Sequence, residues 1–206
     1  MGMVAIWMAE VPLHFVEAAV QIAETAVQIA EAPVRLLAIS GSLRAVSSNT
    51  ALLRAASLLA PDGVEITLYT GVGDLPHFNP DLEASEPPAV TDVRARIKMA
   101  DGLLISSPEY AHGVPGVLKN ALDWLVGGEE FVGKPVALLN ASPRATHAQG
   151  SLAETVKTMS ARLVPEASIA VPLLGKNLDE AGIVANPEMA SALRAAIAAF
   201  ARAISP

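Results

Sequence analysis

One segment of the chain gathers side chains that could bind a phosphate ester. Residues 40–49 read SGSLRAVSSN and lead into an expected helix. Backbone N–H groups and the dipole at a helix N-terminus favour an anion, and a guanidinium can bind phosphate through two parallel hydrogen bonds. The candidate donors are Ser42, Arg44, Ser47, Ser48 and Asn49. Together they predict a site for a terminal phosphate monoester, although Ser47, Ser48 or Asn49 alone would also suit an ordinary N-cap.

The same segment lacks the glycine patterns of two large nucleotide-binding classes. It contains neither Gly-x-Gly-x-x-Gly nor Gly-x-x-x-x-Gly-Lys-Ser/Thr. The first absence argues against a dinucleotide fingerprint and the second against a P-loop NTPase. A hydroxyl-rich turn with one arginine suits the end of a mononucleotide better than a bridging pyrophosphate.

A second segment, residues 106–125, could border a flat heterocycle. Pro108 stiffens its start, and Gly113 allows the backbone to approach a ligand closely. Such a loop can present N–H and C=O groups to a ring edge, while Tyr110 borders the ring face. Core packing is the alternative for Tyr110 and for Trp124, which falls inside an expected helix.

An alternation of strands and helices from Val34 onward is expected to position both segments. We expect strands at 34–40, 64–69, 102–106, 136–140 and 167–171, helices at 49–60, 90–100, 114–126, 151–163 and 187–204, and a proline-rich loop at 70–88. This order predicts a parallel sheet with helices on both faces, a three-layer α/β/α domain. Five strands and an early phosphate-type turn favour the flavodoxin-like order 2-1-3-4-5, with the ligand crevice beyond the carboxyl ends of the first and third strands.

Residues 1–32 are expected to form a helical extension, with the domain occupying 33–206. The sequence AVQIAE occurs at 19–24 and again seven residues later, so matching apolar residues fall on one helix face. Regularly spaced Glu and Gln residues interrupt the apolar stretch 11–32, which argues against a membrane span. The sequence leaves three roles open for this extension: it packs on the domain, it forms an oligomer contact, or it is an appendage from an upstream start codon.

The composition limits the functional classes. The 206 residues are 52% hydrophobic and 17% charged, which predicts a packed domain. A net charge of -7 argues against broad nucleic-acid binding. The absence of cysteine excludes disulfides, thiolate chemistry and Cys-ligated metals, and suits the cytoplasmic location that we expect. We expect no metal site, no nucleic-acid partner and no membrane partner.

Two motifs carry a resemblance to a known family. They are Gly41-Ser42-Leu43-Arg44-x-x-Ser47-x-Asn49 and Pro108-Glu109-Tyr110-x-x-x-Val114-Pro115-Gly116-x-Leu118-Lys119-Asn120-Ala121-x-Asp123-Trp124. Over roughly Val34 to Ile204 the chain resembles the NADPH-dependent FMN reductase family, flavodoxin-like bacterial FMN, quinone, chromate and azo reductases. The resemblance implies FMN as cofactor, with NADPH or NADH as the hydride source.

The resemblance also implies roles for individual residues. The first motif would hold the FMN phosphate, and Pro108, Glu109, Tyr110 and Ala111 would line the isoalloxazine, largely through their backbone. Many members have Asn at the position of Ala111. The implied cofactor-binding set is Ser42, Arg44, Ser47, Ser48, Asn49, Pro108, Glu109, Tyr110, Ala111, Gly113 and Ser142. No side chain is assigned a catalytic role, because the flavin carries the chemistry.

A third segment, residues 141–150, departs from the family pattern. Many relatives have Ser-x-Gly-x-x-Gly-Gly there, whereas this chain has Pro143, Arg144 and His147. Ser142 keeps the serine and could reach the pyrimidine edge of the flavin. Arg144 or His147 would favour negative charge near N1 of the reduced flavin, and a solvated surface loop is the alternative.

The implied activity is hydride transfer from NAD(P)H through FMN to a small-molecule acceptor: a quinone, a flavin, an azo compound or a metal oxyanion. The resemblance also implies a homodimer or homotetramer. The alternatives are a flavodoxin-type electron carrier or flavin-responsive binding module without turnover, and a relative that has lost FMN. Residues 42–49 lack the Thr-Gly-x-Thr phosphate loop usual in flavodoxins.

Overall fold

The computed structural model describes residues 20–21 and 33–204. Apart from Val20 and Gln21, the helical extension predicted for residues 1–32 lies outside the described residues, so that prediction stays open. The fold below is that of the unit Val34–Pro206. Within the described residues, no helix combines the length and apolar character needed to cross a membrane.

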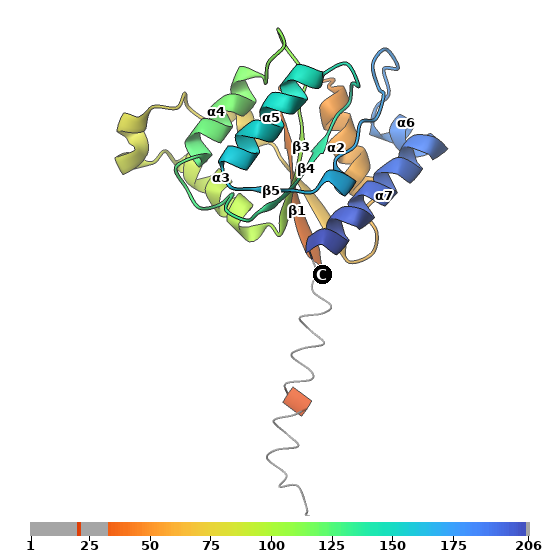
Figure 1. Ribbon diagram of the computed structural model, residues 1–206, viewed down its shortest axis with the longest axis horizontal. Coiled ribbons are helices and arrows are strands. Elements are labelled where there is room, and N and C mark those ends of the chain that lie inside the picture. The colour runs from red at the N-terminus through yellow and green to blue at the C-terminus, as the bar shows by residue number, and fades with distance from the viewer. Residues whose placement is uncertain (1–19, 22–32, 205–206) are drawn as a thin grey trace, which may run out of the picture. The chain divides into compact units, whose positions relative to one another are not determined.

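A five-stranded parallel sheet forms the centre of the domain (Figure 1). Its strands are β1 (Val34–Ser40), β2 (Val64–Tyr69), β3 (Gly102–Ser106), β4 (Pro135–Leu139) and β5 (Arg162–Leu163). They are hydrogen-bonded in the order β2-β1-β3-β4-β5, which confirms the predicted topology. In the register of the sheet, Ser40 at the end of β1 pairs with Ser106 at the end of β3. The loops after these two strands therefore begin side by side.

Helices cover both faces of the sheet, which confirms the three-layer prediction. They are α2 (Ser48–Leu58), α3 (Pro88–Met99), α4 (Gly116–Leu125), α5 (Thr146–Thr158), α6 (Glu180–Ala185) and α7 (Pro187–Ile204). Figure 1 shows α3, α4 and α5 on one side and α2, α6 and α7 on the other. The alternation of side chains along β1 feeds both cores: Leu36 and Ala38 join one buried cluster, and Leu37 and Ile39 join the other.

The prediction for the fifth strand was wrong. The strand lies at Arg162–Leu163 rather than at 167–171, and the predicted segment pairs with the sheet only through a single bridge between Ala170 and Asn140. Pro165 has no N–H to donate to a ladder, and it begins the short 3₁₀ helix η3 (Pro165–Ala167). The ladder therefore ends before the apolar run that suggested a strand.

Other predicted boundaries also need correction. The helix expected at 151–163 is α5, which starts at Thr146 and ends at Thr158, so the third loop is shorter than expected. Helix α6 was not predicted. The expected proline-rich loop at 70–88 contains two 3₁₀ helices, η1 (Gly71–Asp74) and η2 (Pro80–Ser85), and its last residue is the first of α3.

Side chains of α4 anchor the segment between β2 and α3. Asn120 Oδ1 accepts a hydrogen bond from the Phe78 N–H at 2.7 Å, and Asn120 Nδ2 donates to the Pro76 carbonyl at 2.9 Å. One helical turn further on, Trp124 Nε1 donates to the same carbonyl at 2.8 Å. Trp124 is also buried, as the packing alternative expected. Its indole thus fills the core and fixes a loop.

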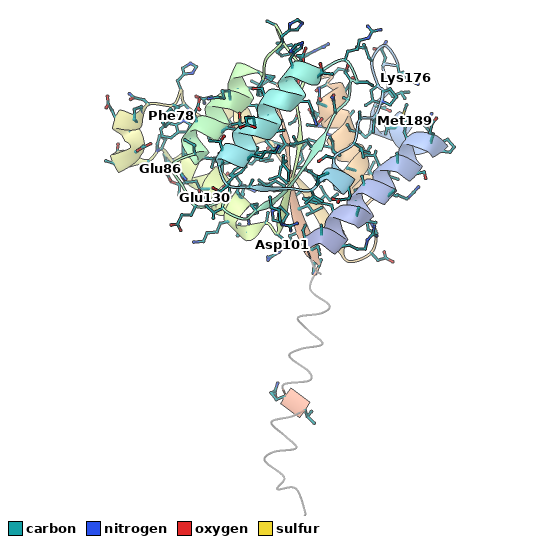
Figure 2. All side chains as sticks on the ribbon, in the orientation of Figure 1. Phe78, Glu86, Asp101, Glu130, Lys176 and Met189 are labelled. Carbon is teal, nitrogen blue, oxygen red and sulfur yellow. The ribbon has the colours of Figure 1, made fainter. Side chains whose placement is uncertain are left out.

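An ion-pair network holds the far end of the same segment. The Arg94 guanidinium lies 2.7 Å from Glu86 and 2.8 Å from Glu130, and all three side chains are largely shielded from solvent. Figure 2 shows Glu86 and Glu130 close together on the side of the domain that carries α3 and α4. Arg94 therefore ties the residues just before α3 to the loop after α4.

Candidate functional site

The first two loops come close together where they leave the sheet. The Gly41 N–H donates to the Ser106 carbonyl at 2.8 Å. A Cβ at Gly41 would lie 2.9 Å from Ser107 Oγ and 3.0 Å from a methyl group of Leu118. A side chain at this position would require the side chains of Ser107 and Leu118 to shift, so glycine suits the close approach of the two loops.

The serines and asparagine of the first loop shape the start of α2. Ser47 is the N-cap, and its hydroxyl accepts from the Thr50 N–H at 3.3 Å, so the capping interpretation holds for this residue. Ser48 is the first residue of the helix. Asn49 is buried, and its Oδ1 accepts from the Ser106 hydroxyl at 2.9 Å, which links α2 to β3.

The Arg44 guanidinium is uncommitted at the tip of this loop. The Arg44 N–H donates to Ser42 Oγ at 3.4 Å, which shapes the turn. Within the described part of the chain, its exposed side chain has no ion pair and no hydrogen bond. An unpaired guanidinium beside serine hydroxyls and a helix N-terminus is suited to a phosphate monoester.

The second loop is a two-residue hairpin, which the sequence analysis missed. Tyr110 and Gly113 exchange backbone hydrogen bonds of 3.2 and 3.0 Å. Between them, Ala111 and His112 have φ angles of 49° and 59°, the left-handed conformation of a type I′ turn. The available signal was the Asn that many family members have at position 111, because Asn tolerates this conformation better than Ala. Tyr110 is 52% exposed beside the turn.

Two contacts join the second loop to the start of α5. Glu109 Oε2 accepts from the Ala148 N–H at 2.8 Å. The cap residue of α5, Ala145, has no side chain that could do this, so Glu109 supplies the missing acceptor from another loop. The rings of His112 and His147 stack with centroids 4.4 Å apart and an interplanar angle of 18°.

The start of α2, the second loop and the third loop line a cleft of about 340 Å³. Of the predicted site residues, its walls contain Ser48, Asn49, Pro108, Glu109 and Ser142. Arg44, Ser47 and Ser48 line one neighbouring hollow, and Arg44 and Tyr110 line another. Ser42, Ala111 and Gly113 lie on the same loops. Sequence reasoning missed Ser107, Asn140 and Leu174, which also line the cleft.

These residues fit a flavin mononucleotide. Arg44 and the serines offer donors for its phosphate, while the hairpin and the exposed ring of Tyr110 offer backbone groups and an apolar face for its ring system. The cleft volume is within the usual range for small-molecule sites. Among the described residues, no cluster of three or more His, Cys, Asp or Glu side chains could hold a metal ion.

The fold and this cleft define a flavodoxin-like domain with a mononucleotide-type site at the carboxyl edge of its sheet. Residues 34–175 match the family model of the NADPH-dependent FMN reductases, and the chain belongs to that family. The structure is similar to FerB, a flavoenzyme NAD(P)H:(acceptor) oxidoreductase of Paracoccus denitrificans, with a TM-score of 0.69 and 31% identity over 82% of this chain and 96% of that one.

Curated relatives match a shorter part of the chain. The chain is 47% identical over 107 residues to an NAD(P)H-dependent FMN reductase of Pseudomonas aeruginosa, a match that covers 50% of this chain and 57% of that protein. It is 37% identical over 106 residues to a quinone reductase of Escherichia coli, covering 50% and 56%. The chain thus spans little more than half the length of these relatives.

Proposed function

We propose that this protein is an NAD(P)H-dependent, FMN-containing reductase that transfers hydride to a small-molecule acceptor, with quinones the foremost class. The observation that carries the proposal is the meeting of an uncommitted Arg44 and a backbone hairpin at one edge of the sheet. Membership of the family and the names of the quinone and FMN reductases among its relatives support it.

In this proposal the first loop holds the FMN phosphate. Arg44 supplies a charge-assisted bidentate contact, and the hydroxyls of Ser42, Ser47 and Ser48 add donors around it. The Ser47 hydroxyl can donate to a phosphate oxygen while its lone pair caps α2. Asn49 positions these donors indirectly, because its hydrogen bond with the Ser106 hydroxyl holds the start of α2 against β3.

The second and third loops hold the ring system. Backbone groups of Pro108, Glu109, Ala111 and Gly113 border its edge, Tyr110 borders its face, and Ser142 reaches its pyrimidine side. The two backbone hydrogen bonds between Tyr110 and Gly113 hold the hairpin that presents these groups, which lowers the ordering cost on binding. When bound, FMN supplies hydride transfer between nicotinamide and acceptor, and the protein residues bind and orient the reactants.

The proposed overall reaction is balanced by one proton. NAD(P)H and a proton reduce a quinone to a hydroquinone and leave NAD(P)⁺; free flavin, azo compounds and metal oxyanions are the other acceptor classes.

We further propose a cytoplasmic homodimer or homotetramer. The absence of cysteine suits a reducing compartment, and the family resemblance supports self-association.

The test is steady-state NADPH and NADH oxidation by the purified protein with a quinone, after reconstitution with FMN. We expect a yellow protein with flavin absorbance and turnover that depends on both FMN and quinone. A yellow protein without turnover would indicate an electron carrier or binding module instead. A colourless protein that gives no heat on titration with FMN would contradict the cofactor assignment.

A further inference from the structure

Strand β2 forms one edge of the sheet, so part of its backbone faces no neighbouring strand. The Val34 N–H donates to the Gly63 carbonyl at 2.8 Å, which fixes how the first two strands pair. A parallel ladder uses the backbone groups of alternate residues, so every second residue of β2 turns its N–H and C=O away from β1. These outward residues are Val64, Ile66 and Leu68.

The outward groups are only partly bonded within the domain. The Val64 N–H donates to the Pro61 carbonyl at 3.1 Å, and the Ile66 carbonyl accepts from the Ser57 hydroxyl at 3.0 Å. Among residues 20–21 and 33–204, the Ile66 N–H and both backbone groups of Leu68 have no hydrogen-bond partner. An open edge with such groups can pair with a strand of another chain.

The side chains of β2 divide between the two faces of the sheet. Those of the outward residues pack against the apolar cluster that includes side chains of α2. On the opposite face Glu65 and Thr67 are exposed, and they line a hollow of about 220 Å³ together with Arg96 and Met99 of α3. A strand that pairs with this edge must therefore present apolar side chains to one face and polar side chains to the other.

Large apolar side chains lie exposed on both sides of the edge. Leu58 follows Ser57 on α2 and is 65% exposed, and Met99 in the hollow is 61% exposed. A second sheet joined at β2 would remove apolar surface of both residues from water, which favours association.

A second copy of β2 meets these requirements in an antiparallel pairing about a twofold axis at Ile66. Directly opposite residues of an antiparallel pair share a face of the sheet. On the apolar face, Ile66 then lies opposite the partner's Ile66, and Val64 lies opposite the partner's Leu68. On the polar face, Glu65 lies opposite the partner's Thr67. The open N–H and C=O groups of the outward residues face one another across the axis.

The neighbouring registers that keep the faces matched are less favourable. An axis at Glu65 would set two carboxylates directly opposite each other, which destabilises a strand pair. An axis at Thr67 would set Glu65 opposite the partner's Tyr69, which is buried in the core of the domain. The sequence of β2 is thus self-complementary in the register centred on Ile66.

Charge complementarity favours the same register. The partner's Glu65 lies opposite Thr67, and Thr67 shares its hollow with Arg96. Arg96 is paired with Asp92 at 2.8 Å, and both side chains are about half exposed. A guanidinium has five N–H donors, so Arg96 can contact the partner's carboxylate as well.

We propose that two copies of this chain associate edge to edge through β2, so that their five-stranded sheets join into one continuous sheet. The inference rests on the self-association proposed above and names the surface that carries it. A closed twofold contact of this kind also removes the open edge that would otherwise be available to other strands. The pairing uses no residue of the cleft, so it is tested separately from FMN binding and turnover.

Disulfide trapping tests the register directly, because the chain contains no cysteine of its own. Glu65→Cys and Thr67→Cys are single variants at exposed positions. In the proposed register these positions form a non-hydrogen-bonded pair, whose Cα atoms lie about 4.5 Å apart, within the range of a disulfide. When the two variants are mixed and oxidised with glutathione disulfide, we expect the 65–67 disulfide to form faster than either like pair. Intact-mass spectrometry separates the three products, and Ser191→Cys on α7 is the control for random collision.

Charge reversal tests the strength of the contact. In sedimentation over a range of concentrations, we expect Glu65→Arg to raise the dissociation constant of the dimer roughly tenfold or more, because it sets a positive charge beside the partner's Arg96. Glu166→Arg makes the same change at an exposed carboxylate elsewhere and should leave the constant unchanged. Thermal unfolding of both variants checks that each is folded.

The outcomes separate this surface from self-association in general. A monomer at every concentration would overturn both. A dimer that Glu65→Arg leaves as strong as the wild type, without a 65–67 disulfide, would overturn the β2 pairing and leave association through another face. Faster trapping of two Glu65→Cys chains with each other would also contradict the proposal, because it would show a different register.

Discussion

The carboxylate of Glu109 caps a helix that begins 37 residues later in the chain, through a 2.8 Å hydrogen bond from the Ala148 N–H. The bond connects the hairpin loop to the start of α5, which follows the third loop, so it holds these two walls of the cleft together. It also supplies an acceptor to the first turn of α5, whose N-cap residue Ala145 makes no side-chain capping hydrogen bond.

Loss of the Glu109 carboxylate should destabilise the domain. We expect Glu109→Ala to lower the free energy of unfolding by about 1–2 kcal/mol, because a charge-assisted cap is removed and an N–H is left without its acceptor. Glu109→Gln should cost less, since an amide oxygen still accepts. Urea unfolding without added FMN measures both. Glu166→Ala, which removes an exposed carboxylate elsewhere, is the matched control, and an equal loss there would contradict the capping role.

Removal of the Arg44 guanidinium should weaken FMN binding. We expect Arg44→Ala to lose about 1.5–3 kcal/mol of binding free energy, the value of one charge-assisted bidentate contact. Quenching of FMN fluorescence on titration with protein gives the affinity. Arg194→Ala is the control, and unchanged FMN affinity in Arg44→Ala would mean that the phosphate lies elsewhere.

Two substitutions at Ala111, in the strained turn, should change the free energy of unfolding in opposite directions. With φ at 49°, Ala111→Asn should raise the free energy of unfolding by about 0.5–1 kcal/mol, because Asn tolerates the left-handed region. Ala111→Val should lower it, because a β-branched side chain is poorly accommodated there. Thermal and urea unfolding measure the pair. Destabilisation by both variants would show that the turn does not hold this conformation in solution.

Asn120 should control the order of the segment between β2 and α3. In Asn120→Ala the Phe78 N–H loses its acceptor and the Pro76 carbonyl keeps only Trp124. We expect a loss of about 1–3 kcal/mol and faster hydrogen exchange at residues 71–87. Mass spectrometry of exchanged peptides locates the change. Lys119→Ala removes only an exposed ion pair with Asp123 on the same helix, and should leave exchange in that segment as in the wild type.

Tyr69 should make the domain less stable in alkali. Burial, and next the Asp92 carboxylate, raise the pKa of Tyr69 above its ordinary value of 10.0. Between the ordinary and the raised value the native state keeps a proton that the unfolded chain has lost. The free energy of unfolding therefore falls as pH rises through this window.

Comparison with Tyr69→Phe isolates this effect. The variant should lose less stability than the wild type when urea unfolding is measured at about pH 9 and again at about pH 11, on either side of the tyrosine's ordinary pKa. Burial lowers the pKa of Lys134, so this residue makes the free energy of unfolding rise with pH. Because Lys134 is present in both the wild type and Tyr69→Phe, its effect cancels in the comparison. Parallel losses in the two proteins would show that Tyr69 does not contribute.

Much of this architecture followed from local patterns in the sequence. The apolar run at Val34–Ser40 and the hydroxyl-rich turn after it predicted a buried strand and an anion-binding loop, because a strand covered on both faces needs continuous apolar residues. The parallel topology then places the carboxyl ends of β1 and β3 at one edge of the sheet, and the register seen in the structure sets Ser40 beside Ser106, where the first two loops begin.

Contacts between distant residues were decided only by the tertiary structure. Glu109 and Ala148 are 39 residues apart, and Asn120 and Pro76 are 44 residues apart, so no local pattern links them. The fifth strand was misplaced for a related reason: the apolar run 167–171 resembled a strand, but pairing with β4 occurs at Arg162–Leu163, before Pro165. Sequence periodicity indicates which residues are buried, whereas hydrogen bonding between distant segments decides which residues pair and where a helix begins.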